Sequence, residues 1–265
     1  MKSHFFFWII IASLSASAQN SSRTIDSLLK ILKKGSHSEQ FERYIMLSDE
    51  YSNSDLNKAE YYSYKALNKA RLVKDDSFIA LSYNNIGNIH QYKSELDSAL
   101  FFHKKTLRLR QSIKDTIGLA DTYNNIGIVY DTKGQYPDAL KYYFKALNFY
   151  ERKGDISKQA MTTTNIGIVY KAQKEYNKAL YYYKRAYELY LKTQNEFGKT
   201  TSAGNLGSIL INFKQYQESL KYSEIARKGF KQLGYNRYEV YPISNIACAY
   251  DSLHQFEFAN KKYAE

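Results

Sequence analysis

The stretch NNIGNIH at residues 84–90 returns along the chain with few changes. NNIGIVY (124–130), TNIGIVY (164–170), GNLGSIL (204–210) and SNIACAY (244–250) follow it, each 40 residues after the last. A fixed period of this length is typical of repeat proteins, in which each copy is one supersecondary unit stacked on its neighbours. The sequence therefore predicts an array of similar units.

Each copy contains two helical patterns joined by a short turn. In the third copy the turn is KGQYP (133–137), and Gly154 ends the second helix. A residue suited to capping the next helix recurs every 40 residues, at Asp75, Asp115, Asp155 and Asn195. The unit is thus a helical hairpin. We place a first, degenerate copy at the start, and the predicted copies are 40–79, 80–119, 120–159, 160–199, 200–239 and a partial 240–265.

The array resembles the tetratricopeptide repeat family, in which a Gly on the first helix is followed three residues later by Tyr, and small residues recur on the second helix. In the third copy these are Gly127, Tyr130, Ala139 and Ala146. The resemblance covers residues 40–265 and implies an all-α fold, a right-handed α-solenoid of stacked helical hairpins. Two departures are the missing Trp four residues before the Gly and the missing Pro near the end of the second helix. Armadillo-type repeats are a distant alternative.

The recurring Gly is the first feature of the motif to explain. Gly inside a helix costs about 1 kcal/mol relative to Ala. A chain that accepts this cost in four copies gains a close crossing of the two helices of each hairpin, with aromatic side chains of the second helix over the gap. We interpret this Gly as structural.

The N-terminus has the pattern of a secretory signal. A basic start precedes an apolar run from Phe5 to Leu14, and Ala16-Ser17-Ala18 forms a cleavage site. We predict a signal peptide at 1–18, with an uncleaved anchor as the alternative, and a capping helix within 19–39. No later apolar stretch is long enough to span a membrane. These features predict an exported protein, periplasmic or on the cell surface.

The composition contains no sign of catalysis. The net charge is +12, but the basic residues are scattered, as on solvated helix faces. No phosphate-binding, nucleophile-elbow or zinc-protease motif occurs. His90 and His103 lie in one copy and are expected to touch, but two ligands are too few for a structural metal site. We predict no enzyme activity, no cofactor and no metal.

The Asn of the motif lies about 160° around the first helix from the Gly, away from the hairpin partner. In the family that the array resembles, this face lines a groove for peptides. The groove residues predicted in this way are Asn85, Asn88, Asp121, Asn125, Ile128, Met161, Asn165, Ile168, Asn205 and Asn245. None of the positions assigned to the groove is Lys or Arg. The alternative is that the Asn side chains only bond to the adjacent repeat.

These features predict a scaffold that binds a protein or peptide partner. The layout is similar to the N-terminal sensory region of bacterial histidine kinases and LuxR-type regulators that contain tetratricopeptide repeats, which implies a role in signal transduction. The competing hypothesis is a free periplasmic or surface scaffold without a signalling role. A nucleic-acid binder is disfavoured by the signal and by the uncharged groove.

Overall fold

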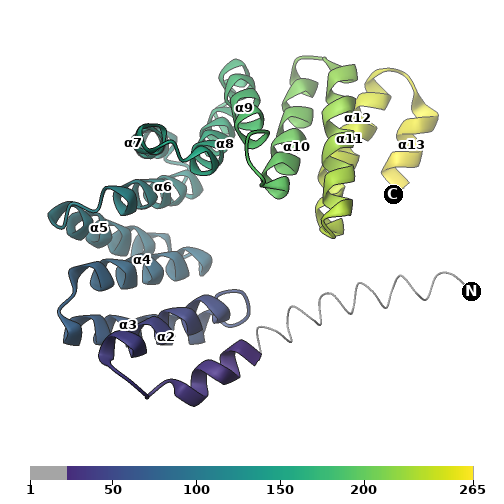
Figure 1. The fold of residues 1–265 in the computed structure, drawn as a ribbon. Coiled ribbons are helices and arrows are strands. Elements are labelled where there is room, and N and C mark those ends of the chain that lie inside the picture. The colour runs from purple at the N-terminus through teal and green to yellow at the C-terminus, as the bar shows by residue number, and fades with distance from the viewer. Residues whose placement is uncertain (1–22, 265) are drawn as a thin grey trace, which may run out of the picture. The chain divides into compact units, whose positions relative to one another are not determined.

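The computed structural model describes residues 23–264, and this part of the chain is helical with no strand (Figure 1). A helix over residues 23–31 comes first. The following helices are α2 (His37–Tyr51), α3 (Leu56–Val73), α4 (Asp76–Tyr92), α5 (Leu96–Ser112), α6 (Thr116–Thr132), α7 (Tyr136–Lys153), α8 (Ile156–Ala172), α9 (Tyr176–Tyr190), α10 (Glu196–Asn212), α11 (Tyr216–Gln232), the 3₁₀ helix η1 (Asn236–Tyr238), α12 (Val240–Ser252) and α13 (Phe256–Ala264).

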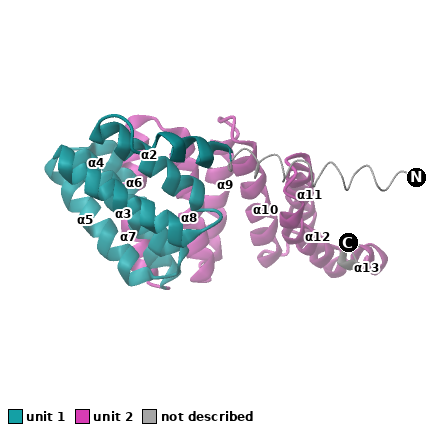
Figure 2. Cartoon of the chain, turned by 90° about the horizontal axis from the view of Figure 1, so that it is seen from below, with its two compact units in different colours: residues 1–133 teal, residues 134–265 magenta. Residues whose placement is uncertain are grey.

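The helices form two compact units, 1–133 and 134–265, which are described separately (Figure 2). In the first unit α2 packs on α3 and α4 on α5, and each second helix also packs on the next first helix. In the second unit the pairs α8–α9, α10–α11 and α12–α13 do the same. Each unit is a stack of helical hairpins, so the predicted all-α solenoid is confirmed.

Capping side chains mark where the first helix of each repeat begins. Asp75, Asp115, Asp155 and Asn195 each accept a hydrogen bond from a backbone N–H in the first turn of the helix that follows. The predicted caps are therefore confirmed. The helices α4, α6, α8 and α10 start 40 residues apart, four residues before the copies numbered from the sequence.

The motif Gly lies where the two helices of a hairpin approach closely. A Cβ on Gly87 would lie 2.7 Å from the ring of His103, and one on Gly167 would lie 2.7 Å from the ring of Tyr183. On Gly207 it would meet Ser223 Oγ at 2.2 Å. In these hairpins the side chain sixteen residues after the Gly occupies the space that a Cβ would take. The structural interpretation of the Gly is confirmed.

The described N-terminal helix lies within the segment 19–39 that was predicted to contain it. It covers residues 23–31 and is followed by a turn in which Gly35 has φ +78°. Ser36 then caps α2 through a reciprocal pair of hydrogen bonds with Glu39, so a new helix begins at His37. Residues 1–22, which include the predicted signal peptide, lie outside the described residues.

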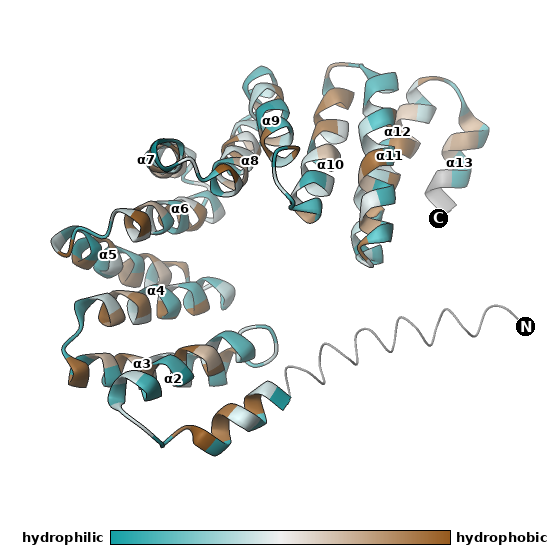
Figure 3. Ribbon diagram, viewed as in Figure 1, coloured by the Kyte–Doolittle hydropathy of each residue, from teal (hydrophilic) through white to brown (hydrophobic). Residues whose placement is uncertain are grey.

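Hydrophobic and hydrophilic residues are mixed along the helices (Figure 3). Each helix buries one stripe against its neighbours and exposes the other side, as expected for packed hairpins. Within residues 23–264 no helix is both long enough and apolar enough to cross a membrane.

Candidate polypeptide-binding groove

The ten predicted groove residues all lie on the first helices of hairpins. Asn85 and Asn88 are on α4, and α6 carries Asp121, Asn125 and Ile128. Unit 2 holds the other five: Met161, Asn165 and Ile168 on α8, Asn205 on α10 and Asn245 on α12. Most of these side chains are partly or largely buried, whereas Met161 and Ile168 are exposed.

In the first unit the Asn side chains connect adjacent repeats. Asn85 donates through Nδ2 to Asp49 Oδ1 at 3.1 Å, on the first helix of the preceding hairpin. Asn125 Nδ2 lies 3.1 Å from Asn84 Oδ1 and 3.3 Å from Asn88 Oδ1. The alternative interpretation, hydrogen bonds between repeats, therefore holds for these two residues. A role for them toward a ligand stays a prediction.

The Asp49 carboxyl, which accepts the hydrogen bond from Asn85, has a raised pKa. Desolvation raises the pKa of the Asp49 carboxyl, the neighbouring Glu50 carboxylate raises it further, and the hydrogen bond from Asn85 partly offsets both. The amide of Asn85 thus partly compensates the desolvation of this carboxyl at the junction between repeats.

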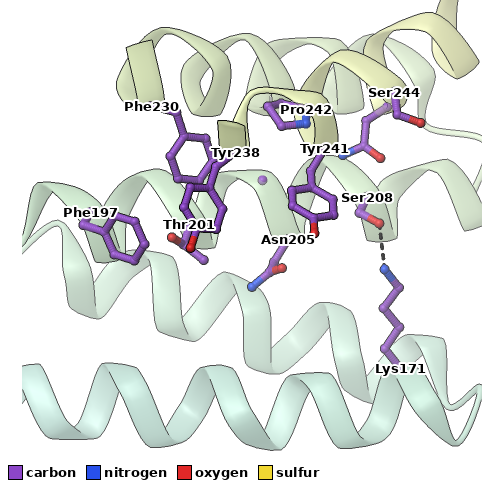
Figure 4. A pocket seen from close by; sticks show the side chains of 12 residues that line it. Lys171, Phe197, Thr201, Asn205, Ser208, Phe230, Tyr238, Tyr241, Pro242 and Ser244 are labelled. Carbon is purple, nitrogen blue, oxygen red and sulfur yellow. Dashed lines mark hydrogen bonds between the residues drawn. The ribbon is translucent and has the colours of Figure 1, made fainter. Parts of the chain in front are cut away.

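The second unit contains a pocket of about 430 Å³ on the same face of its first helices (Figure 4). It lies among α8, α10, α11, η1 and α12. Its lining combines aromatic rings with short polar side chains and is formed by Lys171, Phe197, Thr201, Gly204, Asn205, Ser208, Phe230, Tyr238, Tyr241, Pro242, Ser244 and Asn245. Thus two of the predicted residues, Asn205 and Asn245, come together here.

The helix α12, which borders the pocket, starts later than the repeat predicts. The 40-residue period predicts a start at residue 236, but α12 begins at Val240 and η1 occupies the missing turn. Pro242 explains the delay, because its ring has no N–H and would clash with the carbonyl four residues earlier in a longer helix. The first turn of the regular repeat is therefore replaced by η1, whose Tyr238 lines the pocket.

Aromatic rings form one wall of the pocket. Phe230 and Tyr238 stack with centroids 5.7 Å apart, and Phe197 meets them edge to face at 6.0 and 6.2 Å. Tyr241 adds a further ring that is 67% exposed. Rings held against one another in this way offer a rigid apolar surface at little entropic cost.

The polar groups of the pocket differ from those of the first unit. The side-chain amides of Asn205 and Asn245 make no hydrogen bond within residues 23–264, so both are available to a ligand. Asn165 on α8, by contrast, is already engaged. An amide offers both donors and an acceptor, which matches the backbone of a peptide.

Lys171 corrects the prediction that the groove contains no cation. This residue, four after Gly167, donates from Nζ to Ser208 Oγ at 2.7 Å and lines the pocket. Burial lowers the pKa of its ammonium group. Helical geometry places its Cα on the side of the hairpin partner, but a long flexible stem carries the charged group to the neighbouring helix. A count of helix angles alone could not predict this.

No site for a metal is formed by the described residues. Residues 23–264 contain no group of three His, Cys, Asp or Glu side chains arranged to hold one. His90 stacks on Phe102 and lies 2.6 Å from Glu95 Oε2, whereas the ring of His103 lies against Gly87. His90 and His103 thus pack against different residues.

The described fold is a helical-repeat solenoid with a pocket on its first helices, and comparison with known proteins gives its family. The profile of the tetratricopeptide repeat matches residues 78–152 and 118–192. Residues 78–192 therefore consist of tetratricopeptide repeats, as the sequence motif predicted. No curated protein matches it.

Solved structures with similar folds come from several organisms. BtubC from P. vanneervenii has a TM-score of 0.69 at 17% identity, over 81% of this chain and 90% of its own. The signal transduction ATPase with a tetratricopeptide repeat sensor from Pyrococcus horikoshii has a TM-score of 0.78 at 19% identity, over 96% of this chain and 40% of its own. The apo quorum sensor NprR from B. thuringiensis has a TM-score of 0.63 at 16% identity, over 97% of this chain and 83% of its own. These likenesses concern the fold.

Proposed function

We propose that this protein is an exported scaffold that binds a segment of a partner polypeptide at the pocket between α10 and α12. The observation that carries the proposal is the combination of an aromatic wall with two amides that have no internal hydrogen bond. A volume of about 430 Å³ is in the range of ligand pockets. The wall accepts an apolar side chain, and the amides of Asn205 and Asn245 bond to the adjoining peptide backbone.

Polypeptide is favoured over nucleic acid by the charge of the pocket. Among the described residues that line the pocket, Lys171 is the one cation, and the ammonium group of Lys171 already donates to Ser208. Nucleic acids need several basic contacts along the phosphate backbone.

The sensory role that the layout implies is part of the proposal. Among proteins of similar fold, the ATPase from Pyrococcus horikoshii is described as having a tetratricopeptide repeat sensor, and NprR is described as a quorum sensor. A ligand that bridges α10 and α12 could favour one arrangement of the neighbouring hairpins over another. The size of this shift equals the difference between its binding free energies for the two arrangements. The competing proposal is a free periplasmic or surface scaffold, in which binding changes nothing downstream.

Selection of random peptides displayed on phage tests the binding site. We expect the purified chain to enrich peptides that share an aromatic or large aliphatic residue. Replacing Tyr241 by Ser should weaken them about tenfold or more, because truncation of an interface Tyr often removes over 1 kcal/mol. Tyr181→Ser is the matched control, since Tyr181 is 60% exposed on α9 and does not line the pocket. Equal loss in both variants, or no loss in either, contradicts the proposal.

Export is tested separately. Expressed in a bacterium with a working secretion pathway, the chain should be recovered from the periplasm without residues 1–18, because Ala16-Ser17-Ala18 precedes the expected cut. The measurement is the intact mass of the recovered protein. Recovery of the uncut chain from the cytoplasm alone would refute export.

A further inference from the structure

The first unit contains a pocket of about 430 Å³ of different chemistry, between α4 and α5. Ile79, Tyr83 and Leu109 form its apolar part, Lys105 and Arg108 contribute two cations, and Asp76 contributes one carboxylate. On α4 the residues that line it lie on the side away from Asn85, according to the 3.6-residue period. This pocket is therefore distinct from the predicted groove.

The cations around this pocket lack acidic partners. Lys105 Nζ lies over the rings of Tyr83 and Phe101, 5.2 and 4.4 Å from their centroids. Neither Lys105 nor Arg108 forms an ion pair within residues 23–264. Arg71 on α3 adds a third cation at the edge, with Nη2 3.5 Å from the Tyr83 hydroxyl.

In the fourth repeat, the positive charge at the positions that match Arg71, Lys105 and Arg108 is replaced or paired. Eighty residues after Arg71, Lys105 and Arg108 are Glu151, Arg185 and Glu188, and Ile156 replaces Asp76. Arg185 there forms an ion pair with Glu151 of the preceding repeat. The net charge of these four positions is +2 in the second repeat, from three cations and one carboxylate, and −1 in the fourth, from one cation and two carboxylates.

We infer that the pocket between α4 and α5 binds an acidic segment of a partner polypeptide, in which a carboxylate meets Lys105 and Arg108 and an adjacent apolar side chain rests on Tyr83 and Leu109. The net charge of +2 is complementary to such a segment, and it contrasts with the negative charge of the matching positions in the fourth repeat. A nucleic acid would need a track of cations, and the matching positions of the fourth repeat are acidic. The carboxylate of Asp76, at the edge of the pocket, can accept hydrogen bonds from the backbone N–H groups of a bound peptide.

The test uses the tetrapeptide acetyl-Glu-Leu-Asp-Leu-amide and its counterpart acetyl-Lys-Leu-Lys-Leu-amide, titrated into the purified chain and followed by NMR. We expect the acidic peptide alone to shift the signals of Tyr83, Lys105 and Arg108. In the double variant Arg71→Glu/Arg108→Glu, which introduces the residues of the fourth repeat, the Kd should rise at least about tenfold. Added salt should weaken binding to the unaltered chain.

The control is Lys184→Glu/Lys228→Glu, which makes the same change in net charge at two exposed positions of α9 and α11. It should bind the acidic peptide like the unaltered chain. Equal weakening in both double variants, or equal shifts by both peptides, overturns the inference. So does a dT6 oligonucleotide that shifts these signals when the acidic peptide does not. Tyr241→Ser should leave this binding intact, so the result is separate from that for the pocket of the second unit.

Discussion

Acidification from pH 7 to pH 4 is expected to remove about 3 kcal/mol of stability through one side chain, His103. Its ring is fully buried on α5, and neither ring nitrogen has a hydrogen-bond partner among residues 23–264. Burial, with a smaller contribution from the nearby Arg110 guanidinium, lowers the pKa of His103 to about 4. An unfolded chain binds the proton near pH 6.5, so below that pH protonation favours the unfolded state until the folded ring also titrates near pH 4.

The variant His103→Phe isolates this effect. Tyr143 and Tyr183 hold six-membered rings at the matching positions of the next two repeats, so an aromatic ring suits this place in the hairpin. The difference in the free energy of urea unfolding between the variant and the unaltered chain should widen by about 3 kcal/mol from pH 7 to pH 4. His37→Phe, at an exposed residue of α2, is the control and should show no such widening. A difference that does not depend on pH would contradict the burial of a neutral ring.

Replacement of Gly167 by Leu is expected to destabilise the fourth hairpin by roughly 1–3 kcal/mol. The first added carbon would lie 2.7 Å from Cδ1 and Cε1 of Tyr183, whose ring is itself buried and has little room to move. The helices α8 and α9 must then separate. The thermal midpoint and the urea midpoint should both fall.

Gly204→Ala is a control on another first helix. A Cβ there would lie 3.5 Å from the Cβ of Ala226, an ordinary contact. This variant should be stabilised by about 0.5–1 kcal/mol, because Ala favours a helix over Gly. Opposite signs for the two substitutions support the close crossing at Gly167, and an unchanged melting curve for Gly167→Leu would refute it.

The repeat itself could be predicted from the sequence because it depends on local chemistry that recurs. A capping side chain such as Asp155 and a small residue such as Gly167 each act within one hairpin, so their spacing reports the architecture directly. The start of α2 at His37 was missed, although Ser36 and Glu39 form a capping box that could have indicated it.

The candidate site was less predictable because it depends on where the repeat is broken. Pro242 delays α12, and the aromatic wall of Phe197, Phe230 and Tyr238 collects around the resulting gap. The presence of Pro242 was visible in the sequence, but its consequence needed the regular helix start for comparison. Lys171 was missed because the direction of a long side chain does not follow from the angle of its Cα.

The central claim is that Asn85 and Asn125 of the motif are structural, whereas Asn205 and Asn245 bind a ligand. The most direct test compares two double variants, Asn85→Ala/Asn125→Ala and Asn205→Ala/Asn245→Ala, in urea unfolding and in affinity for a peptide selected on the unaltered chain. Each lost amide bond is worth about 0.5–1.5 kcal/mol. We predict that the first variant loses about 1–3 kcal/mol of stability and keeps its affinity, whereas the second keeps its stability and binds about tenfold or more weakly. If Asn205→Ala/Asn245→Ala is destabilised while its folded fraction binds the peptide normally, the claim is wrong.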